Sequence, residues 1–212
     1  MRICVLADDP LKSEFLQKGI PGNVEILWAD TVKVMYSISD VDVYFDLLFT
    51  MDHERINRLR KLEGKVVFIN SVCNTLSETG GSFIRVNAWP TMLQRSITEV
   101  AVRDHAQQSI VIDIFKNLQW KHQFVPDVPG MITPRVIAMI INEAYYTLEQ
   151  NVSTKDEIDL AMKLGTNYPL GPFEWSEKIG LKNISSLLLT LSNTEARYQP
   201  SALLVKESKL LE

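Results

Sequence analysis

Histidine and cysteine are scarce in this sequence, and their scarcity limits the chemistry that the chain can perform. Among 212 residues there are three histidines and two cysteines. The cysteines, Cys4 and Cys73, lie far apart in apolar runs and lack the spacing of a metal-ligating pair. We therefore expect no metal site and two reduced thiols of the kind found in cytoplasmic proteins.

Long apolar runs and an excess of positive charge are also absent. No run approaches the roughly 18 residues that a membrane span needs, and the N-terminal M-R-I-C-V-L-A-D-D-P has too short an apolar stretch for a secretory signal. The formal net charge is -4 and the pI is about 5.5, which disfavours nucleic acids and anionic membranes as partners. These absences predict a globular cytoplasmic protein with neither kind of partner.

The first part of the chain alternates between strand and helix patterns. Its near-continuous apolar runs are typical of parallel strands that are buried on both faces. We expect strands at 2–7, 24–29, 41–49, 65–70, 84–89 and 97–102, and helices at 10–18, 52–62 and 104–118. This alternation predicts a parallel sheet with helices on both faces. The second strand runs quickly into the third, which leaves little room for a helical insertion between them.

Strand patterns are absent from Pro134 onward. The hydrophobic periodicity predicts helices at about 134–150, 153–163, 172–180, 183–192 and 200–210. Two prolines in the V-P-D-V-P-G stretch at 125–130 resist continuation of either a strand or a helix. The chain is therefore expected to contain an α/β domain at 1–127 and an all-helical domain at 128–212.

The run 159–175, D-L-A-M-K-L-G-T-N-Y-P-L-G-P-F-E-W, predicts a packing corner between two helices. Gly165 is expected to end the first helix. Pro172 suits the first position of the next helix, where a missing N–H does no harm. Phe173 and Trp175 should then face the core.

The helical part contains P-G-M-I-T-P-R-V-I-A-M-I-I-N-E-A (129–144), D-E-I-D-L-A-M-K-L-G-T-N-Y-P-L-G-P-F-E (156–174) and Q-P-S-A-L-L (199–204). These segments resemble the C-terminal domain of 3-hydroxyacyl-CoA dehydrogenases. The resemblance implies a truncated, Rossmann-like parallel-sheet domain followed by an all-helical domain of the 6-phosphogluconate-dehydrogenase C-terminal type. It also implies NAD as cofactor, an acyl-CoA-like ligand from fatty-acid metabolism, and a homodimer through the helical domain.

Glycine is missing from the turn where the resemblance places the NAD pyrophosphate. A dinucleotide fingerprint needs three glycines between the first strand and the first helix. Here the turn contains Ala7, Asp8, Asp9 and Lys12, with no glycine at the fingerprint positions. A carboxylate about 4 Å from a phosphate charge costs on the order of 4 kcal/mol at an effective dielectric near 20. A left-handed conformation at a non-glycine residue costs roughly 1–2 kcal/mol more. The turn is therefore expected to bind NAD poorly.

The proton-transfer positions of the family are mostly replaced as well. Glu99 falls on the Glu position, which in the family orients a His general base. The His position, twelve residues earlier, is occupied by Asn87, or by Val86 if the alignment slips by one residue. Neither side chain takes a proton from an alcohol, and loss of general base catalysis alone is worth roughly 10²–10⁴ in rate.

The two other catalytic positions also differ from the family pattern. The Asn position of the family holds Pro134, and the Ser position becomes Cys73 or Asn74, depending on how the loop is aligned. Glu99 is thus the only matched catalytic position. Asn87, Cys73, Asn74 and Thr133 are the further candidates for the ligand cleft.

Three functions are compatible with these residues. The first is a divergent family member that has lost most redox chemistry and retains a site for an acyl-CoA-like ligand. The second is a working NAD-dependent dehydrogenase with rearranged catalytic groups. The third is a structural or interaction module that uses the broad apolar face of the 134–150 helix as a dimer contact.

Overall fold

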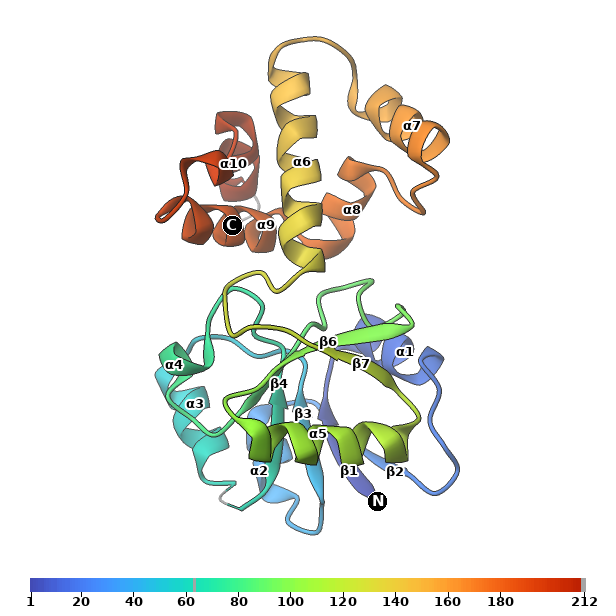
Figure 1. Cartoon of the computed structure of the whole chain (residues 1–212), viewed down its shortest axis with the longest axis vertical. Coiled ribbons are helices and arrows are strands. Elements are labelled where there is room, and N and C mark those ends of the chain that lie inside the picture. The colour runs from blue at the N-terminus through green and yellow to red at the C-terminus, as the bar shows by residue number, and fades with distance from the viewer. Residues whose placement is uncertain (63, 211–212) are drawn as a thin grey trace. The chain divides into compact units, whose positions relative to one another are not determined.

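The computed structural model describes residues 1–62 and 64–210, which divide into two compact units (Figure 1). The α/β unit comprises Met1–Met131, and the helical unit comprises Ile132–Glu212. The end of the predicted helical domain, at 211–212, lies outside the described residues.

A seven-stranded sheet in the order β2-β1-β3-β4-β5-β6-β7 forms the centre of the α/β unit. Its strands are β1 (Arg2–Leu6), β2 (Glu25–Ala29), β3 (Val43–Asp46), β4 (Val66–Ile69), β5 (Ile84–Val86), β6 (Ile97–Ala101) and β7 (Lys121–Phe124). The first five run parallel, and their order 2-1-3-4-5 is that of a doubly wound sheet. The winding direction reverses between β1 and β3, where such sheets usually bind ligands.

Helices cover both faces of this sheet (Figure 1). They are α1 (Asp9–Gln17), α2 (Val32–Ser37), α3 (His53–Arg60), α4 (Leu76–Thr79) and α5 (His105–Leu118). On one face, the aromatic rings of Phe45 and Phe68 stack at 4.5 Å and pack in one cluster with Phe15 of α1 and Phe115 of α5. On the other face, side chains such as Cys4 pack with α2 and α3. The apolar runs of the sequence therefore reflect burial on both faces, as predicted.

Four features of the α/β unit differ from the sequence-based expectation, and two of them are the unpredicted strand β7 and the unpredicted short helix α4. A six-residue helix, α2, does fit between β2 and β3, because the Thr31 hydroxyl accepts the Val34 N–H at 3.2 Å and caps its first turn. The sheet is also not wholly parallel, since β5 and β6 are antiparallel. Only residues 87–96, which contain no helix, connect these strands, and a parallel crossover needs a longer connection.

The helical unit contains no strand among its described residues. Its elements are α6 (Thr133–Glu149), α7 (Lys155–Thr166), α8 (Pro172–Ile179), α9 (Leu181–Ser192), a 3₁₀ turn η1 (Ala196–Tyr198) and α10 (Ala202–Lys209). Across residues 1–62 and 64–210, no helix combines the length and the apolar character that a membrane crossing requires.

The corner between α7 and α8 depends on the buried carboxylate of Asp159. It accepts the backbone N–H groups of Phe173 at 2.8 Å and Glu174 at 3.1 Å, and so caps the first turn of α8 from the neighbouring helix. Phe173 and Trp175 are buried, as predicted. The prediction that Gly165 ends α7 was wrong: the helix continues to Thr166, and Asn167 takes the left-handed conformation at its end.

Gly171 lies against this carboxylate, and its replacement by alanine should destabilise the helical unit. An added Cβ would meet Asp159 Cγ at 2.3 Å and displace the carboxylate from both N–H groups. We expect Gly171→Ala to lower the free energy of unfolding by about 2 kcal/mol, as measured by urea denaturation. Gly165→Ala is the matched control, because nothing lies within 4 Å of its added Cβ. If both variants unfold at the same urea concentration, the corner does not depend on this contact.

Candidate functional site

The turn after β1 is closed by the side chain of Asp8. Its Oδ1 accepts the Leu11 N–H at 3.0 Å, which makes Asp8 the N-cap of α1. The N-terminus of a helix at this point is where dinucleotide-binding folds hold a pyrophosphate. In this chain a protein carboxylate takes that position. Asp9 does not share it, because its side chain is 98% exposed.

The backbone of this turn is not strained. Among the described residues, the non-glycine residues with positive φ are Thr91, Gln119, Met131, Asn151 and Asn167, none of which belongs to the turn. The left-handed conformation that a glycine fingerprint would require is therefore not adopted, and the expected cost of about 1–2 kcal/mol does not arise. The turn follows another path, in which Asp8 is extended with φ -78° and ψ 174°.

Lys12 is engaged by carboxylates beside the turn. Its Nζ lies 3.3 Å from Asp30 Oδ1 and 3.8 Å from Asp9 Oδ1. Asp30 directly follows β2, and an acidic residue about 20 residues after the turn contacts a ribose hydroxyl in dinucleotide-binding folds. The sequence analysis missed Asp30. The signal was available in the W-A-D ending of the second strand.

Asn87 and Glu99 lie side by side at the β5–β6 ladder. Asn87 Nδ2 donates to Glu99 Oε2 at 3.4 Å, and the Asn87 N–H donates to the Glu99 carbonyl oxygen at 3.1 Å. Both residues are buried. Val86 is paired with Val100, so Asn87 is the residue that stands beside the glutamate.

Asn87 is not a group that can take up a proton from an alcohol. An amide nitrogen donates hydrogen bonds and has no basic lone pair. The Glu99 carboxylate is directed to donors, since Oε2 accepts from Asn87 and Oε1 lies 3.4 Å from the Arg95 guanidinium. The arrangement stabilises a buried carboxylate and provides no neutral base.

The loop that carries Arg95 is held by two charged side chains of the α1 region. Glu14 Oε1 accepts the Thr91 N–H at 2.7 Å. Lys18 Nζ donates to the carbonyl oxygens of Arg95 at 2.7 Å and Leu93 at 3.3 Å. Burial, with a smaller contribution from the charge of Arg95, lowers the pKa of Lys18 to about 8. Helix α1 thus connects the Asp8 turn to the surroundings of Glu99.

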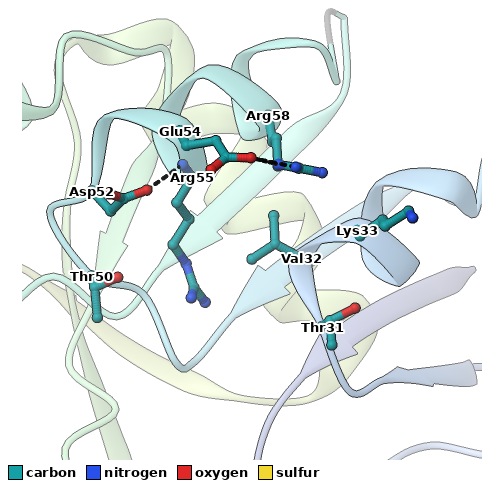
Figure 2. A pocket seen from close by; sticks show the side chains of 8 residues that line it. All are labelled: Thr31, Val32, Lys33, Thr50, Asp52, Glu54, Arg55 and Arg58. Atoms are coloured by element: carbon teal, nitrogen blue, oxygen red, sulfur yellow. Dashed lines mark hydrogen bonds and ion pairs between the residues drawn. The ribbon is translucent and has the colours of Figure 1, made fainter.

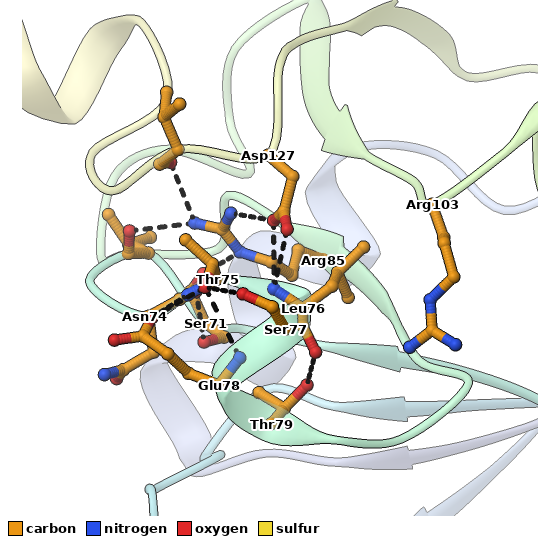
Figure 3. Close-up of polar contacts among 12 residues, drawn as sticks. Ser71, Asn74, Thr75, Leu76, Ser77, Glu78, Thr79, Arg85, Arg103 and Asp127 are labelled. Carbon is orange, nitrogen blue, oxygen red and sulfur yellow. Dashed lines mark hydrogen bonds and ion pairs between the residues drawn. The ribbon is translucent and has the colours of Figure 1, made fainter.

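The loop after β4, which contains Cys73 and Asn74, is organised around a wholly buried arginine (Figure 3). Arg85 of β5 pairs with Asp127 and donates to the carbonyl oxygens of Ser71 at 2.7 Å, Val72 at 3.1 Å and Val128 at 3.2 Å. The Asp127 carboxylate also accepts the Leu76 N–H at the start of α4, at 2.9 and 3.0 Å. Arg85 therefore joins three backbone segments of the α/β unit.

Cys73 lies in this loop and not in a strand. Burial raises the pKa of its thiol to about 12, although the charge of Arg85 acts in the opposite direction. A thiol with such a pKa is a poor nucleophile at neutral pH. The backbone carbonyl of Asn74 accepts the Ser71 hydroxyl at 3.1 Å, so this residue supports the loop.

The remaining predicted positions belong to the helical unit. Thr133 is the first residue of α6, and Pro134 follows it and is buried. The structure thus groups Asp8, Asp9 and Lys12 at one turn and Asn87 with Glu99 in a second group. Cys73 and Asn74 form a third group in the Arg85 loop.

Comparisons with known proteins identify the helical unit. Residues 130–210 match the family model of the 3-hydroxyacyl-CoA dehydrogenase C-terminal domain. A stretch of 90 residues is 44% identical to 3-hydroxyadipyl-CoA dehydrogenase of Escherichia coli (strain K12), covering 42% of this chain and 19% of that protein. A stretch of 82 residues is 42% identical to 3-hydroxybutyryl-CoA dehydrogenase of Bradyrhizobium diazoefficiens, covering 38% of this chain and 28% of that protein.

Solved structures extend the likeness to the fold of both units. The (S)-3-hydroxybutyryl-CoA dehydrogenase of Ralstonia eutropha superposes with a TM-score of 0.72 at 18% identity, covering 97% of this chain and 92% of that chain. FadB2 of M. tuberculosis gives a TM-score of 0.76 at 14% identity, covering 99% of this chain and 93% of that chain.

The fold and these matches define an oxidoreductase scaffold with a Rossmann-type sheet and a helical C-terminal domain. Residues 130–210 match the C-terminal domain of the 3-hydroxyacyl-CoA dehydrogenase family, and the chain as a whole is similar in fold to these proteins. The segments that match the two curated relatives amount to less than a third of the length of each.

The lowered pKa of Lys18 predicts a pH dependence of stability. Its pKa of about 8 in the folded chain lies below the value of about 10.4 for an unfolded chain. The folded state therefore binds fewer protons between these values, and its stability should rise with pH across that window. We expect the wild type to gain stability relative to Lys18→Met from about pH 7.5 to about pH 10 in urea denaturation. A difference between the two proteins that stays constant over this range would contradict the burial of the ammonium group.

Proposed function

We propose that this chain has kept the scaffold of the family but does not perform its NAD-dependent oxidation, and that it binds an acyl-CoA-like thioester. The observation that carries the proposal is the contact between Asn87 and Glu99. The resemblance places the catalytic base at Asn87, and the glutamate that orients this base is still present. An amide at this position cannot act as the base that takes the proton of the substrate hydroxyl.

The cofactor is the second part of the proposal. NAD does not fit the turn in the usual mode of the fold, because the Asp8 carboxylate already accepts the Leu11 N–H that a phosphate would need. A pyrophosphate at this position would also face a like charge. The retained Asp30 is paired with Lys12, so a ribose would compete with an ion pair for this carboxylate.

Other side chains give little support for a rearranged dehydrogenase. The ring of His122 packs edge-on against Phe115 at 5.2 Å and Phe124 at 5.0 Å, and burial lowers its pKa. Burial also raises the pKa values of Cys4, to about 11, and Cys73. These groups act as packed side chains, and protonated thiols suit a cytoplasmic protein.

The distribution of sequence similarity along the chain supports the binding of an acyl-CoA-like thioester. The relatives 3-hydroxyadipyl-CoA dehydrogenase and 3-hydroxybutyryl-CoA dehydrogenase are named for CoA thioester substrates. The family match falls on 130–210, whereas the replaced residues at the turn and beside Glu99 belong to redox chemistry. We infer that this chain has retained thioester binding and has lost hydride transfer.

Self-association through α6 is a second candidate function. One face of this helix remains outside the core, with Val136 55% exposed, and it borders a hollow of about 410 Å³ lined by Met139 and Ile140. Glu143 and Arg135 lie on the same rim, about two helical turns apart. Two copies related by a twofold axis would place each glutamate opposite the partner's arginine, so we propose a homodimer through this face.

Ligand binding and turnover give the test of the first proposal. We expect acetoacetyl-CoA to raise the melting temperature in the absence of NAD, because a ligand at a hundred times its dissociation constant adds about 2.7 kcal/mol to the stability of the folded state. NAD alone should leave the melting temperature unchanged, and 3-hydroxybutyryl-CoA with NAD should give no NADH. Formation of NADH would support the rearranged dehydrogenase, and no response to acetoacetyl-CoA would refute thioester binding.

The dimer is tested by a charge placed on its proposed face. We expect a wild-type mass of twice the 24.2 kDa of the chain in sedimentation equilibrium, and a shift towards the monomer in Val136→Glu, because burial of an unpaired carboxylate is costly. Ile112→Glu in α5 is the control, as Ile112 is 46% exposed in the α/β unit. The same dissociation in both variants, or a monomeric wild type, would contradict the proposal.

A further inference from the structure

A polar hollow of about 310 Å³ lies near the carboxyl ends of β2 and β3, the two strands that flank β1 (Figure 2). It is bordered by Thr31 and Lys33 after β2, by Thr50 after β3, and by Arg55 and Arg58 of α3. No residue of the turn at 7–12 lines it. A ligand group can therefore occupy this hollow without direct contact to the residues of the turn, although Asp30, next to Thr31, pairs with Lys12 of α1. We call it the Arg55 pocket.

Arg55 is fixed in this pocket by a carboxylate beneath it. Asp46, the last residue of β3, has a wholly buried side chain. Its carboxylate pairs with Nη2 of Arg55 and accepts a hydrogen bond from Nε of Arg55 at 2.8 Å. This two-point contact determines the plane of the guanidinium. Among the described residues, no acceptor is bound to Nη1. The Arg55 side chain is 17% exposed, so its remaining donors lie at the pocket with little access to bulk water.

Two further cations at the pocket can respond to an anion. Lys33 makes no ion pair or hydrogen bond through its side chain within the described residues. Arg58 pairs with Glu54 one helical turn away, but these side chains are 37% and 73% exposed, and exposed pairs of this spacing contribute only about 0.3–0.5 kcal/mol. The Arg58 guanidinium can therefore turn to a ligand at small cost.

The acidic side chains of the pocket are already occupied by other donors. Asp52 Oδ1 accepts the Arg55 N–H at 2.8 Å as the N-cap of α3. Glu54 is directed to Arg58 along the helix surface, and Asp46 is held by Arg55. The donors that remain available therefore come from Arg55 Nη1, Lys33, Arg58 and the Thr50 hydroxyl.

We propose that the Arg55 pocket binds a phosphate monoester. A planar guanidinium fixed from behind matches the oxygens of a phosphate, and mobile cations at the rim supply charge. A phosphate ester carries its charge at one end of a molecule, so it can be bound here while the rest of the ligand avoids the Asp8 carboxylate. The site does not depend on thioester binding, and its failure would leave the proposed function intact.

Matched ligand pairs test the site in the full-length protein. Inorganic phosphate, adenosine 2′-phosphate against adenosine, and coenzyme A against dephospho-coenzyme A are titrated by calorimetry at low ionic strength. The members of each of the two pairs differ only by a ribose phosphate monoester. We expect the phosphorylated member of at least one pair to bind about tenfold more tightly, since hydrogen bonds to charged groups contribute about 1.5–3 kcal/mol each. The pair that responds identifies the source of the phosphate.

Variants separate the pocket from general surface charge. Lys33→Ala and Arg58→Ala should each weaken binding of the preferred phosphate ester by about fivefold to tenfold. Lys61→Ala is the control. This substitution removes one positive charge just beyond the end of α3, and Lys61 does not line the pocket. Lys33 is exposed, so its variant should fold even if an arginine variant does not. Equal affinity for both members of every pair, or equal weakening by Lys33→Ala and Lys61→Ala, would overturn the proposal.

Discussion

The N-terminus of α1 has a limited number of N–H donors, and one of them is bound by the chain's own Asp8. In doubly wound folds this helix end attracts the negative charge of a phosphate ligand. In this chain the Asp8 carboxylate accepts a hydrogen bond from one of these backbone N–H groups. The same contact gives the turn an unstrained backbone without any glycine. A single side-chain hydrogen bond therefore caps α1 and closes the turn after β1.

In the helical unit a carboxylate also caps the N-terminus of a helix, and there it supports the packing of two helices. Asp159 caps α8 through two backbone N–H groups, and Gly171 leaves the room that this carboxylate needs. Both N–H groups of that helix end are satisfied within the unit. A carboxylate thus caps a helix in each unit, Asp8 from the residue next to its helix and Asp159 from the neighbouring helix.

Much of the fold could be predicted from the sequence, because apolar periodicity reports which faces are buried. The strand–helix alternation, the all-helical second part and the buried Phe173 and Trp175 follow directly from it. The short helix α2 was missed because six residues carry too little hydrophobic periodicity. The antiparallel direction of β6 was missed because the hydrophobic pattern of a strand does not encode its direction. The contact of Asn87 with Glu99 was found only through the family resemblance. The Arg85–Asp127 pair, 42 residues apart, gives no local signal in the sequence.

Calorimetric titration of NAD into the wild type and Asp8→Gly tests the central claim most directly, with the Leu11 amide followed by NMR. We expect no heat and no shift of this amide in the wild type at about millimolar NAD, because the amide is already bound to Asp8. Asp8→Gly removes the competing charge, and it should bind NAD at least about tenfold more tightly than the wild type. Micromolar binding by the wild type with a shifted Leu11 amide would show that the carboxylate yields to the pyrophosphate and would contradict this account.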